Sequence, residues 1–172
     1  MAGEVSKKEG AMIRSWNRWA MPLIVAASSV LALSGTLALA GDESQVELNK
    51  KSVVEFYEKA FNQKDFDAAK VYFGPQFVEH NPAASGDGTK DIEGIKRFLS
   101  FLRSKFPQSH FEIQRVIAEG DYVAIHSHGV REPGTPGRAI VDIFRLEQGK
   151  IVEHWDAVQD IPEKSSNPRA FF

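Results

Sequence analysis

The spacing of apolar residues changes once along the chain, from a helical repeat to a two-residue alternation that begins at residue 110. Before this point, three segments carry apolar side chains three and four residues apart, the spacing of one helix face; they are residues 44–63, 65–73 and 91–106. After it, apolar and polar residues alternate as in half-buried strands. Helices followed by consecutive strands predict an α+β fold, with three helices packed on one face of a curved antiparallel sheet.

Turn signals divide the alternating region into four strands. Gly120 lies in a hairpin signal near the middle of residues 110–130. The Pro- and Gly-rich segment 132–137 leads to a third strand over residues 138–146, and a short turn leads to the last strand, 150–160. The sequence therefore predicts an antiparallel meander behind the helices.

The turn between the last two strands decides which side chains share a face with Asp142. A three-residue turn puts Asp142 on the face that carries His154 and Asp156. A two-residue turn puts it beside Glu153 and Trp155, because a slip of one residue exchanges the faces of a strand. We expect the three-residue turn. An acid between apolar residues, such as Asp142, must be paired, protonated or catalytic.

The segment Ala-Ile-His-Ser-His, residues 124–128, places His126 and His128 on one face of a strand and Ser127 on the other. Because the opposite face of this strand is largely apolar, the strand can be buried on both sides, and we expect the two histidines to line a polar pocket. Their H-x-H spacing also suits a metal ion, with His154 as a third ligand. A metal site is the alternative interpretation.

Some residues near the end of the chain have a structural interpretation. Glu153 and Trp155 fall on the back of the sheet in the expected register, where Arg145 can pair with Glu153 across the hairpin. The terminal Phe171 and Phe172 are expected to dock on some other surface, since free chain ends rarely expose two aromatic rings.

Residues 1–40 differ from the rest of the chain. Basic residues precede an uncharged run, 19–41, that contains the small-x-small pattern Ala-Leu-Ala of a signal-peptidase site at 38–40. We expect a signal peptide over residues 1–40, cleavage near Ala40, and a periplasmic or secreted domain over residues 41–172. The run is also long enough to span a bilayer, so an uncleaved segment would anchor the protein in a membrane.

Charge and cysteine content narrow the possible partners. The net charge of −2, with no basic patch, does not indicate a nucleic-acid partner. The chain has no cysteine and therefore no disulfide. Residues 41–172 are enough for one domain with a core around a cavity.

Four segments resemble SnoaL-like polyketide cyclases of the nuclear-transport-factor-2-like superfamily; they are residues 78–88, 124–128, 141–160 and 161–172. The resemblance covers nearly all of the chain after Gly41 and is greatest to a subgroup described as aldol-condensation-type enzymes. It implies a cone-shaped α+β fold in which three helices and a strongly bent sheet enclose a pocket. It further implies a homodimer, and chemistry that needs neither a metal nor an organic cofactor.

The resemblance also implies roles for particular residues. The general base of ketosteroid isomerase corresponds to His80, and its oxyanion-hole aspartate corresponds to Asp142. The catalytic acid of limonene epoxide hydrolase falls near Asp156. Tyr57 is the only candidate for the isomerase's oxyanion tyrosine, and Asn81 either caps a turn before Pro82 or lines the pocket.

We therefore predict an exported, cofactor-free enzyme of the lyase or isomerase type that acts on a small hydrophobic carbonyl compound. His80 or Asp156 would remove a proton α to the carbonyl, and Asp142, kept protonated by burial, would donate a hydrogen bond to the enolate. The predicted substrate-binding residues are Tyr57, Asn81, His126, His128 and His154. The alternatives are a non-catalytic periplasmic domain that binds a small molecule, and an accessory domain with a vestigial pocket.

Overall fold

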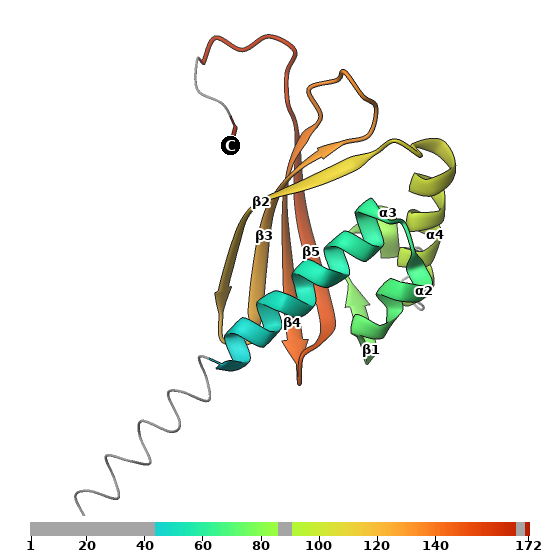
Figure 1. Ribbon diagram of the computed structural model, residues 1–172, viewed down its shortest axis with the longest axis vertical. Coiled ribbons are helices and arrows are strands. Elements are labelled where there is room, and N and C mark those ends of the chain that lie inside the picture. Colours follow the sequence, from blue (N-terminus) through green and yellow to red (C-terminus); the bar gives the residue numbers. More distant parts are fainter. Residues whose placement is uncertain (1–43, 86–90, 168–170) are drawn as a thin grey trace, which may run out of the picture. The chain divides into compact units, whose positions relative to one another are not determined.

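A computed structural model describes residues 44–85, 91–167 and 171–172 of the chain (Figure 1). The predicted signal peptide and part of the 78–88 segment lie outside these residues. The described residues form a five-stranded sheet with helices packed against one face, which is the predicted α+β class. None of the helices within these ranges is long and apolar enough to cross a membrane.

The helices follow the three predicted segments, with one addition. Residues 44–57 are α-helical and continue into a π-helix. The bounds of the other helices are η1 (Glu58–Asn62), α2 (Phe66–Ala69), η2 (Lys70–Tyr72), α3 (Pro82–Ser85) and α4 (Asp91–Lys105). The side chain of Asp65 caps α2 by accepting a hydrogen bond from the Ala68 amide at 3.0 Å. The short α3, which follows Pro82, was not predicted from the sequence.

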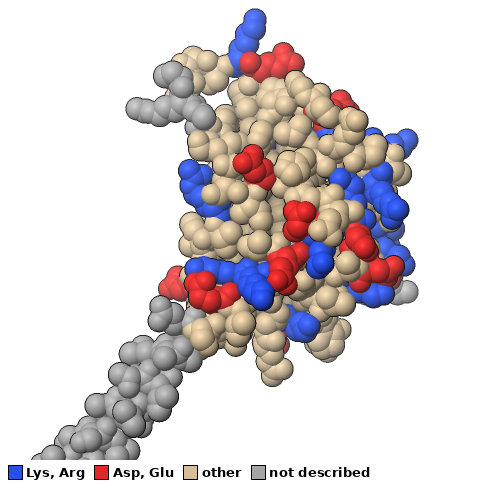
Figure 2. Space-filling model, viewed as in Figure 1, with Lys and Arg blue, Asp and Glu red and all other residues tan. Residues whose placement is uncertain are grey.

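The apolar faces of the long helix and α4 form the core with the sheet. The buried residues of these two helices recur at three- and four-residue intervals; they are Val53, Phe56, Tyr57, Ala60, Ile95, Leu99 and Leu102. Figure 2 shows acidic and basic side chains intermixed with other residues on one face of the molecule.

The sheet has the strand order β1-β5-β4-β3-β2. Its strands are β1 (Phe73–Glu79), β2 (His110–Glu119), β3 (Tyr122–Val130), β4 (Arg138–Glu147) and β5 (Lys150–Asp160). The last four form the predicted antiparallel meander. β1 was not predicted, and it runs parallel to β5, so the sheet is mixed rather than purely antiparallel. Pro75 weakens the strand signal of β1 in the sequence. The structure tolerates this proline because β1 is an edge strand.

The turn between β4 and β5 differs from the prediction. A three-residue turn would pair Leu146 with Lys150, but Glu147 pairs with Lys150 instead. The turn therefore contains two residues, Gln148 and Gly149, with positive φ angles of 52° and 75°. These angles give the primed geometry that matches the twist of a hairpin.

A β-bulge at Val152 reverses the consequence of the shorter turn. Beyond the bulge, Arg145 pairs with Glu153, and Asp142 pairs with Asp156. The extra residue shifts the register of β5 by one. Asp142 therefore keeps the face expected from a three-residue turn, although its cross-strand partner is Asp156 rather than His154. Asp142 and Asp156 therefore share a face with His154, as predicted.

Candidate functional site

A cavity of about 220 Å³ lies between the helices and the sheet face that carries Asp142. Its wall is largely apolar, with contributions from Phe61, Ile95, Phe98 and Phe111. The ionisable groups in its wall come from the long helix and from four strands or their ends. The helix contributes Tyr57, and the strands contribute Glu79, Arg131, Arg138, Asp142, His154 and Asp156. An apolar cavity with a few converging polar groups is typical of a small-molecule site.

His154 of β5 lies at the centre of a buried charged cluster. Its Nδ1 is 2.9 Å from each carboxylate oxygen of Glu79, and its Nε2 is 3.1 Å from Oδ1 of Asp142. Burial by itself would lower the pKa of His154, but the hydrogen bonds and negative charges of Asp142 and Glu79 outweigh it and raise this pKa to about 10. At neutral pH His154 is therefore an imidazolium that donates from both ring nitrogens.

Tyr57 extends this cluster into the helix layer. Its hydroxyl donates to Oδ2 of Asp142 at 2.9 Å and lies 2.7 Å from Oγ of Ser127. The phenol has a single proton, which takes part in the hydrogen bond to Asp142. Ser127 is therefore the donor in the second bond. Burial, followed by the negative charge of Asp142, raises the pKa of Tyr57 well above its ordinary value, which keeps the phenol neutral.

The hydrogen bonds of Asp142 do not match its predicted role. Tyr57 donates to one of its oxygens and His154 to the other, so the carboxylate accepts on both sides. A donor to a substrate enolate would need a proton on one of these oxygens. In this geometry Asp142 holds the imidazolium and the phenol in place.

Asp156 is the carboxylate that faces the cavity beside this cluster. It is opposite Asp142 in the β4–β5 ladder, and its Oδ2 accepts a hydrogen bond from Nδ2 of Asn81 at 2.7 Å. Burial raises the pKa of Asp156, and the negative charges of Asp142 and Glu79 raise it further, against the opposite effects of His154 and Asn81. A half-buried carboxyl with a raised pKa is suited to accept a proton.

The tripeptide Val-Glu-His occurs twice, at residues 78–80, where β1 ends at Glu79, and in β5 at residues 152–154. The two strands are parallel and offset by one residue, since Glu79 is beside His154 and Val78 is beside Glu153. Successive side chains of a strand point to opposite faces. The Glu of each copy therefore meets the His of the other, one pair on the cavity face and one on the back.

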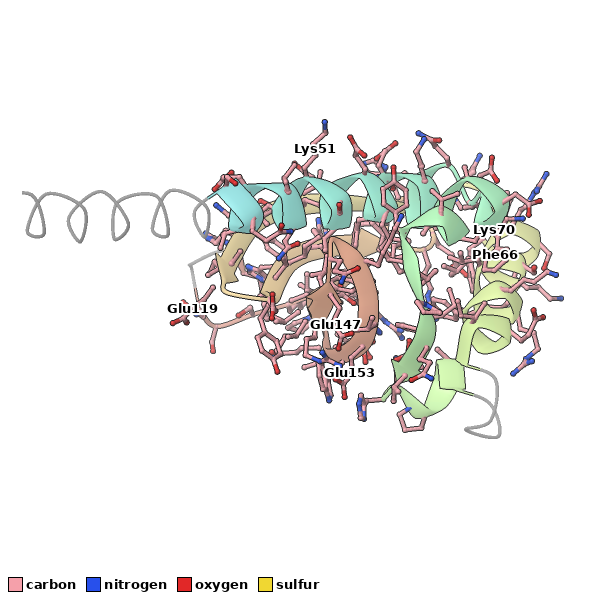
Figure 3. All side chains as sticks on the ribbon, turned by 90° about the horizontal axis from the view of Figure 1, so that it is seen from below. Lys51, Phe66, Lys70, Glu119, Glu147 and Glu153 are labelled. Carbon is pink, nitrogen blue, oxygen red and sulfur yellow. The ribbon has the colours of Figure 1, made fainter. Side chains whose placement is uncertain are left out.

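His80 belongs to the back pair, which corrects its predicted placement in the pocket. Its Nε2 is 2.9 Å from Oε1 of Glu153, and its ring stacks on Trp155 with centroids 4.7 Å apart. The side chain is 40% exposed. Arg145 donates from Nε to the other oxygen of Glu153 at 2.7 Å, as predicted. Figure 3 shows Glu153 on the side of the sheet away from the long helix.

His126 and His128 also lie outside the cavity, contrary to the prediction. His126 Nδ1 is 3.1 Å from a terminal nitrogen of Arg115, and His128 Nε2 is 2.8 Å from the carbonyl oxygen of Pro136. The alternation along β3 was predicted correctly, but the face was not. The β3–β4 ladder places Asp142 beside Ile125, so the apolar side of β3 is the cavity side.

The C-terminal aromatic rings dock on this back face, as predicted. The ring of Phe172 lies 5.0 Å from that of His126 and 4.9 Å from that of His128, and Phe171 lines a shallow depression beside His126. Within residues 44–85, 91–167 and 171–172, no group of three or more His, Asp or Glu side chains is arranged to hold a metal ion.

The structure thus gathers five of the eight predicted site residues around one cavity: Tyr57, Asn81, Asp142, His154 and Asp156. It also brings in four residues that sequence reasoning missed, which are Glu79, Ser127, Arg131 and Arg138. Glu79 follows Phe77 at the two-residue spacing of a strand. This signal was missed because β1 was not recognised in the sequence. The two arginines flank the Pro- and Gly-rich loop, where periodicity carries no information.

The family model of the SnoaL-like domain matches residues 53–154. Among solved structures, IdmH, a proposed polyketide cyclase from Streptomyces antibioticus, is 27% identical with a TM-score of 0.53, and the match covers 64% of this chain and 91% of that one. A proposed polyketide cyclase from Acidithiobacillus ferrooxidans is 22% identical with a TM-score of 0.54, covering 64% and 87%. A SnoaL-like protein of unknown function from Burkholderia thailandensis is 19% identical with a TM-score of 0.52, covering 64% and 94%. None of the curated proteins matches significantly.

Proposed function

The chain belongs to the SnoaL-like family, and from this membership and the charged cavity we propose that it is a cofactor-free acid–base enzyme acting on a small carbonyl compound. Proton transfer α to the carbonyl is the proposed step, as in aldol-type, isomerase or dehydratase chemistry. The similarity to proposed polyketide cyclases supports the same class of reaction.

Asp156 carries this proposal, because it is a half-buried carboxyl that faces the cavity and has a raised pKa. Glu79 and Asp142 bear two negative charges against the one positive charge of His154. Ionised Asp156 adds another negative charge to this cluster. A proton on Asp156 relieves the repulsion, so this carboxylate is a stronger base than an exposed one.

In the proposed step, a substrate carbonyl lies in the cavity with its α-carbon at Asp156. The C–H bond breaks, its proton passes to Asp156, and its electron pair forms the enolate. The imidazolium of His154 in the same wall stabilises the developing negative charge electrostatically, and Asn81 holds the Asp156 carboxylate in position. The enolate then takes the proton back or attacks a second carbonyl.

The satisfied hydrogen bonds of the inner cluster favour one alternative function. Both nitrogens of His154 and both oxygens of Asp142 have partners within the protein. Such a network can serve as a fixed polar wall without transferring a proton. A non-catalytic domain that binds a small molecule in the same cavity is therefore the second candidate.

Exchange of α-protons with solvent deuterium tests the proposed function. The protein would be incubated in deuterated water with a panel of neutral ketones and β-dicarbonyl compounds, and exchange would be followed by NMR. We expect acceleration by the wild type and a loss of at least about a hundredfold in Asp156→Asn. His80→Ala is the matched control, and its exchange rate should equal that of the wild type, because His80 lies on the back of the sheet.

Two results would count against this function. Undiminished exchange in Asp156→Asn would remove Asp156 as the base. Absence of exchange across the panel, together with measurable ligand binding, would favour the binding domain.

A further inference from the structure

The cavity continues outward past two arginines at the end of the sheet. Arg131 follows β3 and Arg138 begins β4, on either side of the loop that joins these strands (Figure 1). Both line the inner cavity, and both line a more open cavity of about 410 Å³ beside it. The outer cavity contains none of the inner carboxylates Glu79, Asp142 and Asp156. The two arginines therefore stand at the junction of the cavities.

The loop backbone holds Arg138 in this position. Gly137 has a φ angle of 76°, and a Cβ atom added to it would lie 2.6 Å from the carbonyl oxygen of Gly129. Only glycine fits so close an approach. Gly129 is also the ladder partner of Arg138, so the start of β4 is packed against the end of β3.

Arg131 is a partly buried cation without a carboxylate partner. Across the portions of the chain that the structure describes, no Asp or Glu oxygen lies within ion-pair distance of it. Its guanidinium is 5.5 Å from the ring centroid of Phe106, which holds the group over an aromatic face. Burial, followed by the positive charge of Arg138, lowers the pKa of Arg131, and the negative charge of Asp160 opposes this shift. Two like charges are thus held near each other.

Arg138 is only partly neutralised. Its Nε donates to Oδ1 of Asp160 at 2.7 Å, but the Asp160 side chain is 78% exposed, and such pairs are weak. Glu132 and Glu163 also line the outer cavity, so three carboxylates stand beside the two arginines there. All three carboxylates are exposed, and water and salt screen their charges, whereas both arginines are partly buried. This balance suits a single carboxylate better than a group of higher charge such as a phosphate.

The inner and outer ends of the cavity therefore differ in charge. The inner end holds Glu79, Asp142 and Asp156 against His154, and the outer end holds Arg131 and Arg138. An anionic substrate group is repelled by the carboxylates of the inner end and attracted to the two guanidinium groups. A guanidinium binds a carboxylate with two parallel hydrogen bonds, which fixes direction as well as position.

We propose that Arg131 and Arg138 bind a carboxylate of the substrate and so direct its carbonyl end toward Asp156. This inference rests on the proposed function and names its substrate class as a keto acid. Arg138 and Asp142 are four residues apart on one face of β4, or ~13 Å along the strand before the reach of the arginine is subtracted. A carbonyl and a carboxylate separated by several bonds fit this distance.

Paired binding measurements test the inference. The probes are 3-benzoylpropanoate and two phenylalkanoates of different chain length, each compared with its neutral amide by isothermal titration calorimetry. We expect the wild type to bind at least one carboxylate about tenfold more tightly than its amide. In Arg131→Gln and Arg138→Gln this preference should fall to about twofold or less. Arg131→Lys, which keeps the charge but not the bidentate geometry, should retain part of it.

Arg115→Gln is the control, because Arg115 is exposed on the back of the sheet and contacts His126. It should keep the full carboxylate preference. Amide binding that is unchanged in the two glutamine variants shows that the cavity is intact. The inference is overturned if no carboxylate binds the wild type more tightly than its amide, or if both glutamine variants keep the preference.

This experiment separates the two proposals. Exchange of neutral ketones without a carboxylate preference leaves the proposed function standing and overturns the arginine site. A carboxylate preference that depends on the arginines, without α-proton exchange on any probe, supports the site and contradicts the proposed reaction.

Discussion

The two Val-Glu-His tripeptides, one at the end of β1 and one within β5, form two Glu–His pairs of the same composition, one on each face of the sheet. On the cavity face, Glu79 and His154 are almost fully buried, with exposed side-chain fractions of 0% and 9%. On the back, His80 and Glu153 have exposed fractions of 40% and 22%. The hydrogen-bond lengths are equal, at 2.9 Å. Environment rather than residue type distinguishes the pairs.

Burial decides how strongly each pair depends on its partner charges. An imidazolium withdrawn from water needs compensating carboxylates, and Glu79 and Asp142 both supply them to His154. The back pair is hydrated, and Arg145 already neutralises Glu153. The cavity pair is therefore suited to hold a charge where a substrate binds. The back pair is a surface pair and contributes little to stability.

The largest expected difference between the faces comes from removing one carboxylate charge. Glu79→Gln should lower the free energy of unfolding by about 3–5 kcal/mol, because it leaves His154 without one of its buried counter-ions. Glu153→Gln, the same substitution on the back, should lower it by less than ~1 kcal/mol. Urea unfolding of both variants at pH 7 measures the contrast. Equal losses would show that the two pairs do not differ in environment.

The pH dependence of stability sharpens the comparison. The pKa of His154 is raised from an ordinary value of 6.5 to about 10 in the folded protein. Since the folded state binds this proton more tightly, the contribution of His154 is fully present below pH 6.5 and is lost as the pH rises toward 10. NMR titration should find its imidazole still protonated at pH 8.5. Deprotonation of His154 near pH 6.5 would contradict the role of the two carboxylates.

A smaller effect, opposite in sign, is expected at Asp156. Because burial and neighbouring negative charges raise its pKa, its ionised form is unfavourable in the folded protein. Asp156→Asn should therefore raise the free energy of unfolding at pH 7 by about 0.5–1 kcal/mol. Asp160→Asn, at an exposed position on the same strand, is the control and should change stability little. A destabilised Asp156→Asn would indicate a structural role for this carboxylate.

The smallest change is expected for His80→Ala. It removes an exposed hydrogen bond to Glu153 and one ring stacked on Trp155, so the free energy of unfolding should fall by less than ~1 kcal/mol. Thermal unfolding monitored by circular dichroism measures this loss. A loss comparable to that of Glu79→Gln would mean that the back cluster supports the fold.

Periodicity predicted the fold class and most of the elements correctly, because helices and antiparallel strands carry strong local patterns. It failed at β1, where Pro75 weakens the strand signal and the hydrogen-bonded partner is more than seventy residues away. Missing that strand concealed Glu79 and misplaced His80. The alternation along β3 was found, but the choice of face for His126 depended on the neighbouring strand.

The cavity residues of β4 and β5 were grouped correctly for a reason that the sequence did not show. The turn is one residue shorter than predicted, and the bulge at Val152 offsets that difference. Asp142 and Asp156 consequently share a face, although their pairing differs by two residues from the prediction. Longer-range features, such as the arginines beside the loop, required the three-dimensional structure.

The bulge at Val152 also bears on which insertions and deletions this hairpin tolerates. It supplies one residue beyond what regular pairing between Leu146 and Phe144 requires. A natural deletion of Val152 would straighten β5 and leave Glu153 and His154 on their present faces, with the loss of one buried side chain. A deletion between His154 and Asp156 has no such compensation, and it would turn Asp156 out of the cavity. Insertions and deletions in this hairpin among homologous proteins should therefore concentrate near the turn between β4 and β5.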